Sequence, residues 1–316
     1  MDNLTDNHRG AGQPDSLQDR QWSQPPFGGL AARNRWPILV SVLVGVLLIP
    51  AIAYGLISDS AYRGYGQNLV LLSRAQDLLT TLVIPLLVWA SVQSQRGSLP
   101  AHLLWLGLMF YLSYSYAIYL IGWQQNRAFL VYVLVVLLTT AALVDGLVRV
   151  DPSAVRPAVR GFRTTGLGWF LVVVGVAFAG LWLTDIAPSA WGGRAPVNLG
   201  PGGTAYAVYV MDLTVALPMV IATGALLLRR HPMAVVLAGV VLVKITTLFT
   251  ALWLGVLAQL AVGEQVPFTA DMVPSAVLPV VAIVVLVRAA RHLGHPDDGW
   301  IRAQFWPQGA VAHALR

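Results

Sequence analysis

The feature that most constrains this chain is a series of eight apolar runs. A helical span needs about 20 mostly apolar residues to cross a hydrocarbon core of about 30 Å. The runs cover 37–58, 68–95, 101–122, 128–148, 166–185, 205–228, 233–260 and 268–289. Backbone polar groups must be satisfied inside the bilayer, and these runs are too long for barrel strands. The sequence therefore predicts an all-α polytopic membrane protein with eight transmembrane helices.

Composition excludes the other broad classes of protein. Of the 316 residues, 57% are apolar types and 11% are charged, and cysteine is absent. Soluble domains carry about 25% charged residues, and disordered chains are poor in apolar residues. The lack of cysteine also excludes a disulfide scaffold, a thiol nucleophile and an Fe–S cluster. The expected surroundings of this chain are therefore the lipid bilayer.

The arginines predict the orientation of the chain in the membrane. If the N-terminus is cytoplasmic, three arginines face outward, namely Arg63, Arg127 and Arg194. The cytoplasmic side then holds fifteen: Arg9, Arg20, Arg33, Arg35, Arg96, Arg149, Arg156, Arg160, Arg163, Arg229, Arg230, Arg288, Arg291, Arg302 and Arg316. Cytoplasmic loops carry the excess of basic residues. We therefore predict that both termini are cytoplasmic. The arginine-rich, lysine-poor composition further suggests a bacterial source, and hence the inner (cytoplasmic) membrane. The positive-inside distribution then explains the net charge of +6, and we predict no nucleic acid as a partner.

The order of polar and apolar segments divides the chain into three regions. Residues 1–35 are polar and predict a disordered cytoplasmic tail without a cleavable signal peptide. Residues 36–291 form the membrane domain, and residues 292–316 form a cytoplasmic tail.

A shared pattern suggests two parallel four-helix halves, 36–148 and 166–291. Gln76-Asp77 precedes Pro85 in span two, and Met211-Asp212 precedes Pro218 in span six. Both spans then end at a basic turn. Repeats in this relation share a pseudo-twofold axis along the membrane normal. Duplication and chance similarity between two leucine-rich helices both stay open as explanations.

The single lysine of the chain, Lys244, lies in the middle of span seven. A charge near the bilayer centre costs about 2.5–3.5 kcal/mol on insertion scales and usually has a partner. At 1.5 Å per residue, Asp212 lies about 10 Å and Lys244 about 13 Å from the outer edge. Since a short turn joins spans six and seven, they are expected to be antiparallel neighbours. We therefore predict an ion pair between Asp212 and Lys244.

Further polar residues occur in the outer halves of spans two and three. Arg74 and Asp77 share a face of span two at i and i+3. Tyr111, Ser115 and Tyr119 form one stripe on span three. We hypothesise a polar pocket, open to or gated from the outside, with walls from spans two, three, six and seven. Its candidate ligand- or ion-binding residues are Asp77, Asp212, Lys244, Arg74, Tyr111, Ser115 and Tyr119.

Structural interpretations of the same residues stay open. Asp212 and Lys244 can form a fixed internal salt bridge, Arg74 and Asp77 can pair at the headgroups, and aromatic stripes commonly serve packing. Five tryptophans are interpreted as interfacial belt residues: Trp36, Trp105, Trp123, Trp182 and Trp253. Five prolines are candidates for kinks around the pocket: Pro50, Pro85, Pro218, Pro274 and Pro279.

The sequence predicts no catalytic group, no metal site and no cofactor. All six histidines are placed in turns or tails, away from the middle of a span. The glycine-rich segment between Trp191 and Gly203 lacks the lysine of a phosphate loop. Lys244 also suggests a Schiff base with a retinal-like chromophore, but eight spans argue against that alternative.

The tyrosine-rich third span and its surroundings carry a resemblance. The other motifs that carry the resemblance are Gln76-Asp77, Asn126, Phe129-Leu130-Val131-Tyr132 and Met211-Asp212-Leu213. With these motifs the chain resembles an uncharacterised group of bacterial multi-span membrane proteins. The resemblance covers spans two to seven and implies no activity.

These observations favour a small-solute or ion transporter, or a related binding protein, with an outward-facing polar site. One alternative is a non-catalytic membrane subunit whose partner binds the spans or the basic loop between Arg149 and Arg163. Another is a membrane-embedded enzyme that modifies a lipid.

Overall fold

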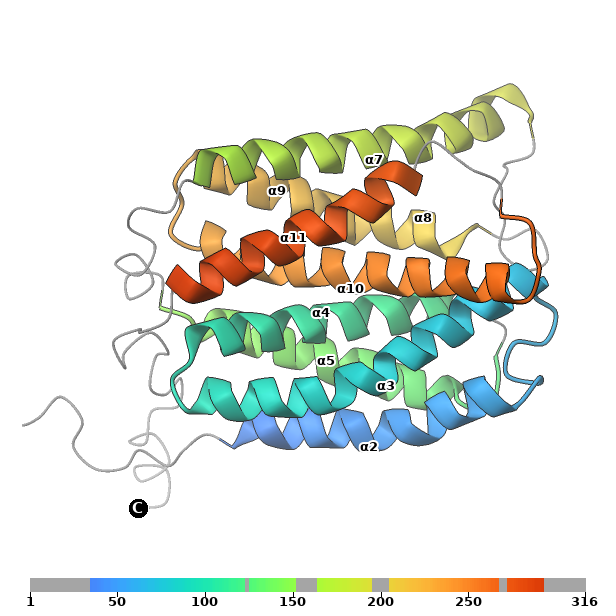
Figure 1. The fold of residues 1–316 in the computed structure, drawn as a ribbon, viewed down its shortest axis with the longest axis horizontal. Coiled ribbons are helices and arrows are strands. Elements are labelled where there is room, and N and C mark those ends of the chain that lie inside the picture. Colours follow the sequence, from blue (N-terminus) through green and yellow to red (C-terminus); the bar gives the residue numbers. More distant parts are fainter. Residues whose placement is uncertain (1–34, 123–124, 152–163, 195–204, 267–271, 293–316) are drawn as a thin grey trace, which may run out of the picture. The chain divides into compact units, whose positions relative to one another are not determined.

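The computed structural model describes residues 35–122, 125–151, 164–194, 205–266 and 272–292 (Figure 1). These residues belong to one compact unit, which covers 35–316. In this part of the chain the long regular elements are helices, and eight are long and apolar enough to cross a membrane. The predicted all-α, eight-span fold is confirmed. The predicted tails lie almost entirely outside the described residues.

The helices follow the predicted spans closely. They are α2 (Trp36–Ile57), α3 (Gln67–Gln95), α4 (Leu99–Gly122), α5 (Phe129–Val148), α7 (Thr164–Gly192), α8 (Ala207–Met211), the π-helical turn η2 (Asp212–Ala216), α9 (Leu217–Leu228), α10 (Ala234–Ala261) and α11 (Met272–His292). The fifth span is longer than predicted, since α7 ends at Gly192 rather than at residue 185. The sixth span consists of α8, η2 and α9 in succession.

Span six changes its helix type beside one of the five candidate prolines. Pro218 has no N–H to donate, and in a regular α-helix its ring would clash with the carbonyl of the residue four positions earlier. Here the N–H of Leu217 donates to the carbonyl of Asp212, five residues back, which closes the π turn. In contrast, α2, α3 and α11 continue through Pro50, Pro85 and Pro279. The one change of helix type at a candidate proline in the described spans is therefore the one at Asp212.

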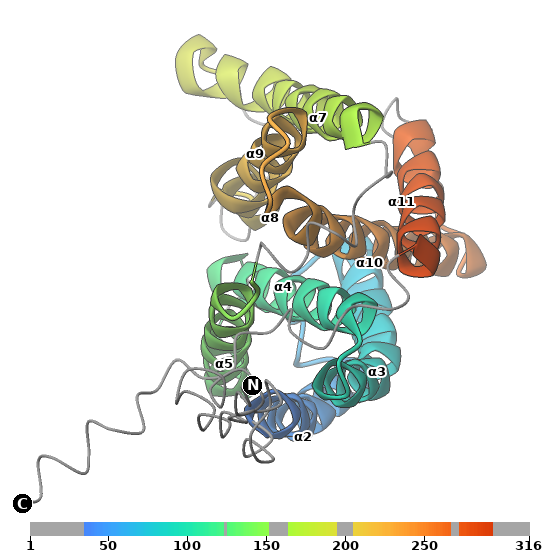
Figure 2. The same ribbon diagram turned by 90° about the vertical axis from the view of Figure 1, so that its left-hand side faces the viewer.

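The helices form two groups of four consecutive spans (Figure 2). In the first group α2 packs on α3, α3 on α4, α4 on α5, and α5 returns to α2. In the second group α7 packs on α9, α9 on α10, and α10 on α11, but among the described residues α11 makes no comparable packing with α7. The groups join where α10 packs against α3 and α4, and where α8 packs against α4. Among the described residues the first group is thus closed by packing of its first and last helices, and the second is not. The two parallel halves stay a prediction, with duplication and chance both open as their origin.

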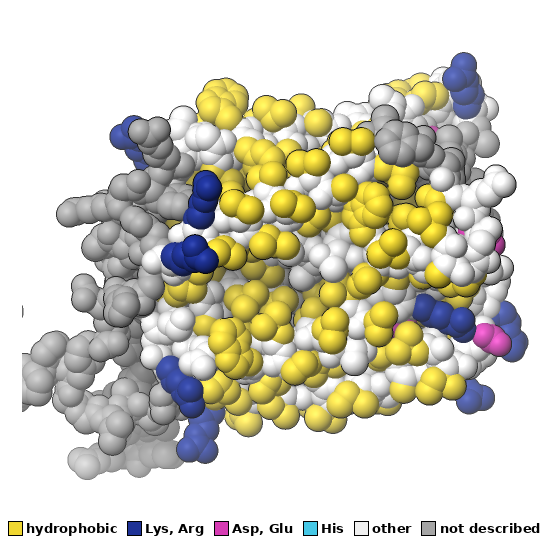
Figure 3. Space-filling model, viewed as in Figure 1, with side chains coloured by type: hydrophobic (Ala, Val, Ile, Leu, Met, Phe, Trp, Pro, Cys, Tyr) yellow, Lys and Arg dark blue, Asp and Glu magenta, His cyan; other side chains and the backbone are white. Residues whose placement is uncertain are grey.

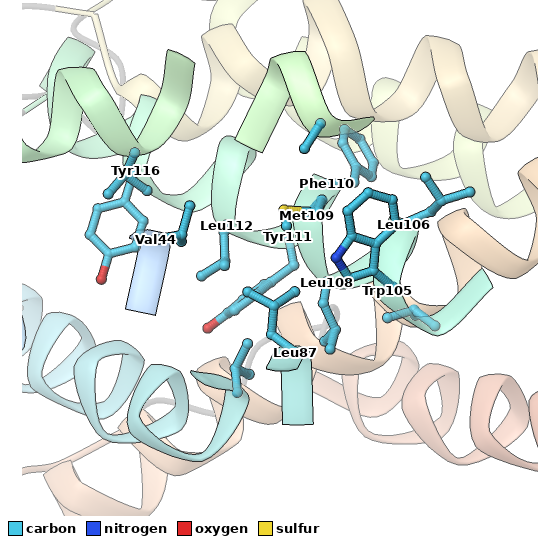
Figure 4. Packing of buried hydrophobic residues seen from close by; sticks show 14 of the residues in the cluster. Val44, Leu87, Trp105, Leu106, Leu108, Met109, Phe110, Tyr111, Leu112 and Tyr116 are labelled. Carbon is cyan, nitrogen blue, oxygen red and sulfur yellow. The ribbon is translucent and has the colours of Figure 1, made fainter. Parts of the chain in front are cut away.

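The most buried helices are α4 and α10, at the junction of the two groups. Close approach there depends on Gly107, because a Cβ at this position would collide with the side chain of Val243. Small residues at helix contacts are the usual means of association in lipid. On its other side, α4 buries Trp105, Leu106, Leu108 and Met109 in the core of the first group (Figure 4).

Trp105 corrects one prediction. It is fully buried rather than interfacial, and its indole N–H donates to Ser41 Oγ at 2.9 Å. A tryptophan near a span end can therefore serve the core when a neighbouring helix offers an acceptor.

The outer faces of the helices are apolar, as lipid contact requires (Figure 3). Arginines lie at both ends of the helices, and the end where α3 joins α4 has more of them. In the described residues these are Arg35, Arg96, Arg149, Arg229, Arg230, Arg288 and Arg291. The chain is thus an integral multi-pass membrane protein.

Candidate functional site

A cavity of about 300 Å³ lies between the two helix groups. Its walls come from α3, α4, α8, η2, α9 and α10, which are the four predicted spans, and additionally from α7 and α11. Tyr65, Gly122 and Tyr206 mark its extension toward the end of the helices opposite the α3–α4 turn. Most of the lining side chains are apolar. The carboxylate and the ammonium group among them belong to Asp212 and Lys244.

Asp212 begins the π turn and is almost completely buried. Its Oδ1 accepts a hydrogen bond from the hydroxyl of Tyr114 on α4 at 2.5 Å. Its Oδ2 accepts one from the indole N–H of Trp182 on α7 at 2.9 Å. Single π turns inside α-helices are frequent at functional sites. The carboxylate is thus held by donors from two other spans, one from each helix group.

Lys244 lies beside this carboxylate, as the depth estimate predicts. Its Nζ is 4.0 Å from Asp212 Oδ1, and its side chain is 5% exposed. Nζ also lies 3.8 Å from the centroid of the Tyr114 ring, a cation–π geometry. Within the described part of the chain, Nζ makes no hydrogen bond. Since an ammonium has three donors, the lysine retains hydrogen-bonding capacity at the cavity wall.

Asp77 belongs to a separate polar cluster and does not line the cavity. Its buried carboxylate accepts a hydrogen bond from the hydroxyl of Tyr62, which lies in the α2–α3 connection. Gly55 on α2 makes room, because a Cβ there would collide with the carboxylate. Burial, followed by the charge of Asp77, raises the pKa of Tyr62 far above its usual value. The hydroxyl therefore stays protonated and remains a donor.

Arg74 forms no ion pair with Asp77, so the structure does not support the alternative in which these two side chains pair at the headgroups. Arg74 forms an ion pair with Asp59 at 2.9 Å, near the start of α3. The Asp59 side chain is fully exposed, so this pair lies at the surface.

The tyrosine stripe on α4 divides between the cavity and the first helix group. Ser115 and Tyr119 line the cavity, whereas Tyr111 does not. The Tyr111 hydroxyl accepts a hydrogen bond from Gln76, whose side chain also reaches the cavity wall. Tyr119 packs edge-on against Tyr116 with the ring centroids 5.4 Å apart. The stripe thus serves both packing and the cavity.

Two contacts of the site were not predicted. Tyr114 lies one turn from Tyr111 on α4, so its depth was available from the sequence, but its contact with Asp212 was not. Trp182, which the sequence predicts to be interfacial, instead lines the cavity and donates to Asp212. The aromatic residues Phe178, Tyr206 and Phe249 also line the wall.

Comparison with protein-family models, with curated proteins and with solved structures found no match to this chain. The sequence resembles multi-span membrane proteins, and the eight long apolar helices of the described residues agree with this class of protein.

The described residues contain no group of three or more His, Cys, Asp or Glu side chains that could hold a metal ion.

His102, predicted to lie in a turn, is buried in the first turns of α4 instead. Its Nδ1 lies 2.8 Å from Ser94 Oγ, and its Nε2 lies 3.2 Å from the carbonyl oxygen of Gly146. These contacts tie α4 to α3 and α5.

Proposed function

We propose that this chain is a transporter or binding protein for a small solute, with its site in the cavity beside Asp212 and Lys244. The observation that carries this proposal is the Lys244 ammonium, which lies in the cavity wall without a hydrogen bond to the described residues. Ionisable groups inside membrane spans are expensive and usually mark a substrate or ion pathway. A volume of about 300 Å³ is at the lower end of the range for ligand pockets.

Two further features support transport rather than a purely structural ion pair. Transporters commonly form their sites at the interface of two repeats, and the π turn that begins at Asp212 lies between the two helix groups. A fixed structural pair would not need an adjoining cavity. The excess of arginines at the α3–α4 end favours a cytoplasmic location of that end. The cavity would then extend toward the outside.

The absence of cysteine allows a direct test by single-cysteine labelling. Ser115→Cys places a thiol in the cavity wall at nearly constant volume, and Ser91→Cys places one in a fully buried position of α3 that does not line the cavity. Intact cells would be treated with a membrane-impermeant maleimide. We expect labelling at residue 115 and none at residue 91, because only the cavity provides a path to water.

Two exposed positions serve as controls for orientation. Arg194→Cys follows α7 and is expected to label from outside, whereas Arg229→Cys follows α9 and is expected to label only after the cells are permeabilised. If residue 115 stays as protected as residue 91 while both controls behave, the proposed outward-facing site is wrong.

A further inference from the structure

We propose that the Lys244 cavity takes an uncharged, bilayer-soluble molecule with an apolar body and a carbonyl oxygen at one end. This inference rests on the proposed function and names the class of ligand for the same site. Three properties of the cavity carry it: its charge balance, the distribution of its hydrogen-bonding groups and the chemistry of its walls.

The charge balance favours an uncharged ligand. Asp212 and Lys244 form a pair that is neutral as a whole, and no other carboxylate, ammonium or guanidinium group lines the cavity among the described residues. An anion bound here would leave one uncompensated negative charge in a low-dielectric site, and a cation would leave one positive charge. Uncompensated buried charges are strongly unfavourable. An uncharged molecule leaves the balance intact.

The hydrogen-bonding groups favour an acceptor at the end of the ligand. Both oxygens of Asp212 already accept hydrogen bonds, from Tyr114 and from Trp182. The Lys244 ammonium has donors to spare, and it makes no hydrogen bond to the described residues. A carbonyl oxygen offers two lone pairs to such donors and brings no donor that would need a partner. Hydrogen bonds from a charged donor are also stronger than neutral ones.

The rest of the wall favours an apolar body. Most of the remaining wall consists of leucine, valine, isoleucine and alanine side chains, together with the rings of Phe178, Trp182 and Phe249. Polar side chains also line it, but Ser73, Gln76 and Ser275 donate their hydrogen bonds within the protein. Burying apolar surface against such walls is favourable by about 25 cal/mol per Å² relative to water. A small polar solute would gain nothing from these contacts and would have to give up its own hydration.

The bilayer is the natural source of such a ligand. Both α7 and α11 contribute to the cavity wall, and both expose apolar side chains on their outer faces, such as Val173 on α7 and Val277 on α11. These two helices make no extensive packing with each other in the described part of the chain. A molecule dissolved in the hydrocarbon therefore lies next to the walls of the site.

The test uses the full-length protein in nanodiscs and four probes with a ten-carbon chain. These are 2-decanone, decane, decanoate and decyltrimethylammonium, which differ in charge and in the presence of a neutral acceptor. Each probe would be tested for its ability to slow the labelling of Ser275→Cys in the cavity wall by N-ethylmaleimide. We expect 2-decanone to protect at concentrations about tenfold lower than decane, the ratio expected for one charge-assisted hydrogen bond. The two charged probes are expected to protect less well than 2-decanone.

Variants of the lysine assign the effect to its ammonium group. Lys244→Met keeps the length and apolar stem of the side chain and is expected to make 2-decanone no better than decane. Lys244→Arg retains a charged donor and is expected to restore part of the difference. Gel filtration and helical circular dichroism of each variant would confirm that it is folded.

Each other outcome overturns the proposal in a distinct way. Lysine-dependent protection that is strongest with decanoate would contradict the uncharged ligand and leave the solute-binding site standing. If 2-decanone and decane protect equally well when Lys244 is present, the carbonyl oxygen does not contribute to binding. If no probe protects residue 275, the ligand class is wrong, and the proposed function then depends on the labelling of residue 115 alone.

Discussion

Replacing Asp212 by alanine is expected to destabilise the protein by about 3–5 kcal/mol, as measured for broken buried ion pairs. The substitution leaves the Lys244 ammonium buried without a counter-ion, and it removes the acceptor of Tyr114 and Trp182. Lys244→Met also leaves a buried charge without its counter-ion, but it is expected to cost less, because the Asp212 carboxylate keeps both of its donors. The measurement is unfolding of the purified protein by SDS, followed by circular dichroism.

The surface pair of Asp59 and Arg74 provides a matched control. Asp59→Ala also removes an aspartate from an ion pair, but its side chain is fully exposed, so no measurable loss of stability is expected. Equal losses for Asp212→Ala and Lys244→Met would contradict the asymmetry that the contacts imply. A loss for Asp212→Ala as small as that for Asp59→Ala would show that the buried pair is hydrated.

Tyr62→Phe is expected to cost about 2–3 kcal/mol, since it leaves the buried Asp77 carboxylate without its hydroxyl donor. The ring stays in place, so packing against Tyr119 is retained. Combining it with Asp77→Asn is expected to lower the added cost, because the charge that needs the donor has been removed. The same SDS titration measures the coupling of the two substitutions in a double-mutant cycle.

Tyr54→Phe is the matched control for this second effect. Its hydroxyl lies 3.1 Å from Ser60 Oγ in a partly buried position, and it contacts no charged group through this bond. The expected loss is therefore below that of Tyr62→Phe. Additive effects of Tyr62→Phe and Asp77→Asn would contradict a direct stabilising bond between the two side chains.

The sequence predicted the eight spans and the Asp212–Lys244 contact for a common reason. Span length and residue depth follow from the thickness of the bilayer and from the rise of a helix. Two residues at similar depth in consecutive spans are close only if both side chains point to the interface between the two helices. A charged side chain favours this orientation, because an unpaired charge that faces lipid is costly. The 4.0 Å distance between Lys244 and Asp212 confirms this reasoning.

The sequence could not assign the direction of each polar residue around its helix axis. Asp77 has a depth compatible with the cavity, but it faces Tyr62, while its neighbour Gln76 reaches the cavity wall. The sequence does not point to α7 and α11 because neither has a charge in the middle of its span, as α10 has in Lys244. The carboxylate of α7, Asp185, lies in the last turns of that helix. Trp182 shows the same limit, since an indole near a span end suits either the headgroups or a buried acceptor.

An experimental density map of the purified protein in nanodiscs would show directly whether the cavity holds a ligand. We expect elongated density in the cavity beside α4 and α10, with one end within about 3 Å of Lys244 Nζ, the distance of a hydrogen bond. A cavity that contains no density, together with Lys244 Nζ hydrogen-bonded directly to Asp212, would contradict this expectation. The pair would then be a closed structural contact, and the cavity would have no ligand to hold.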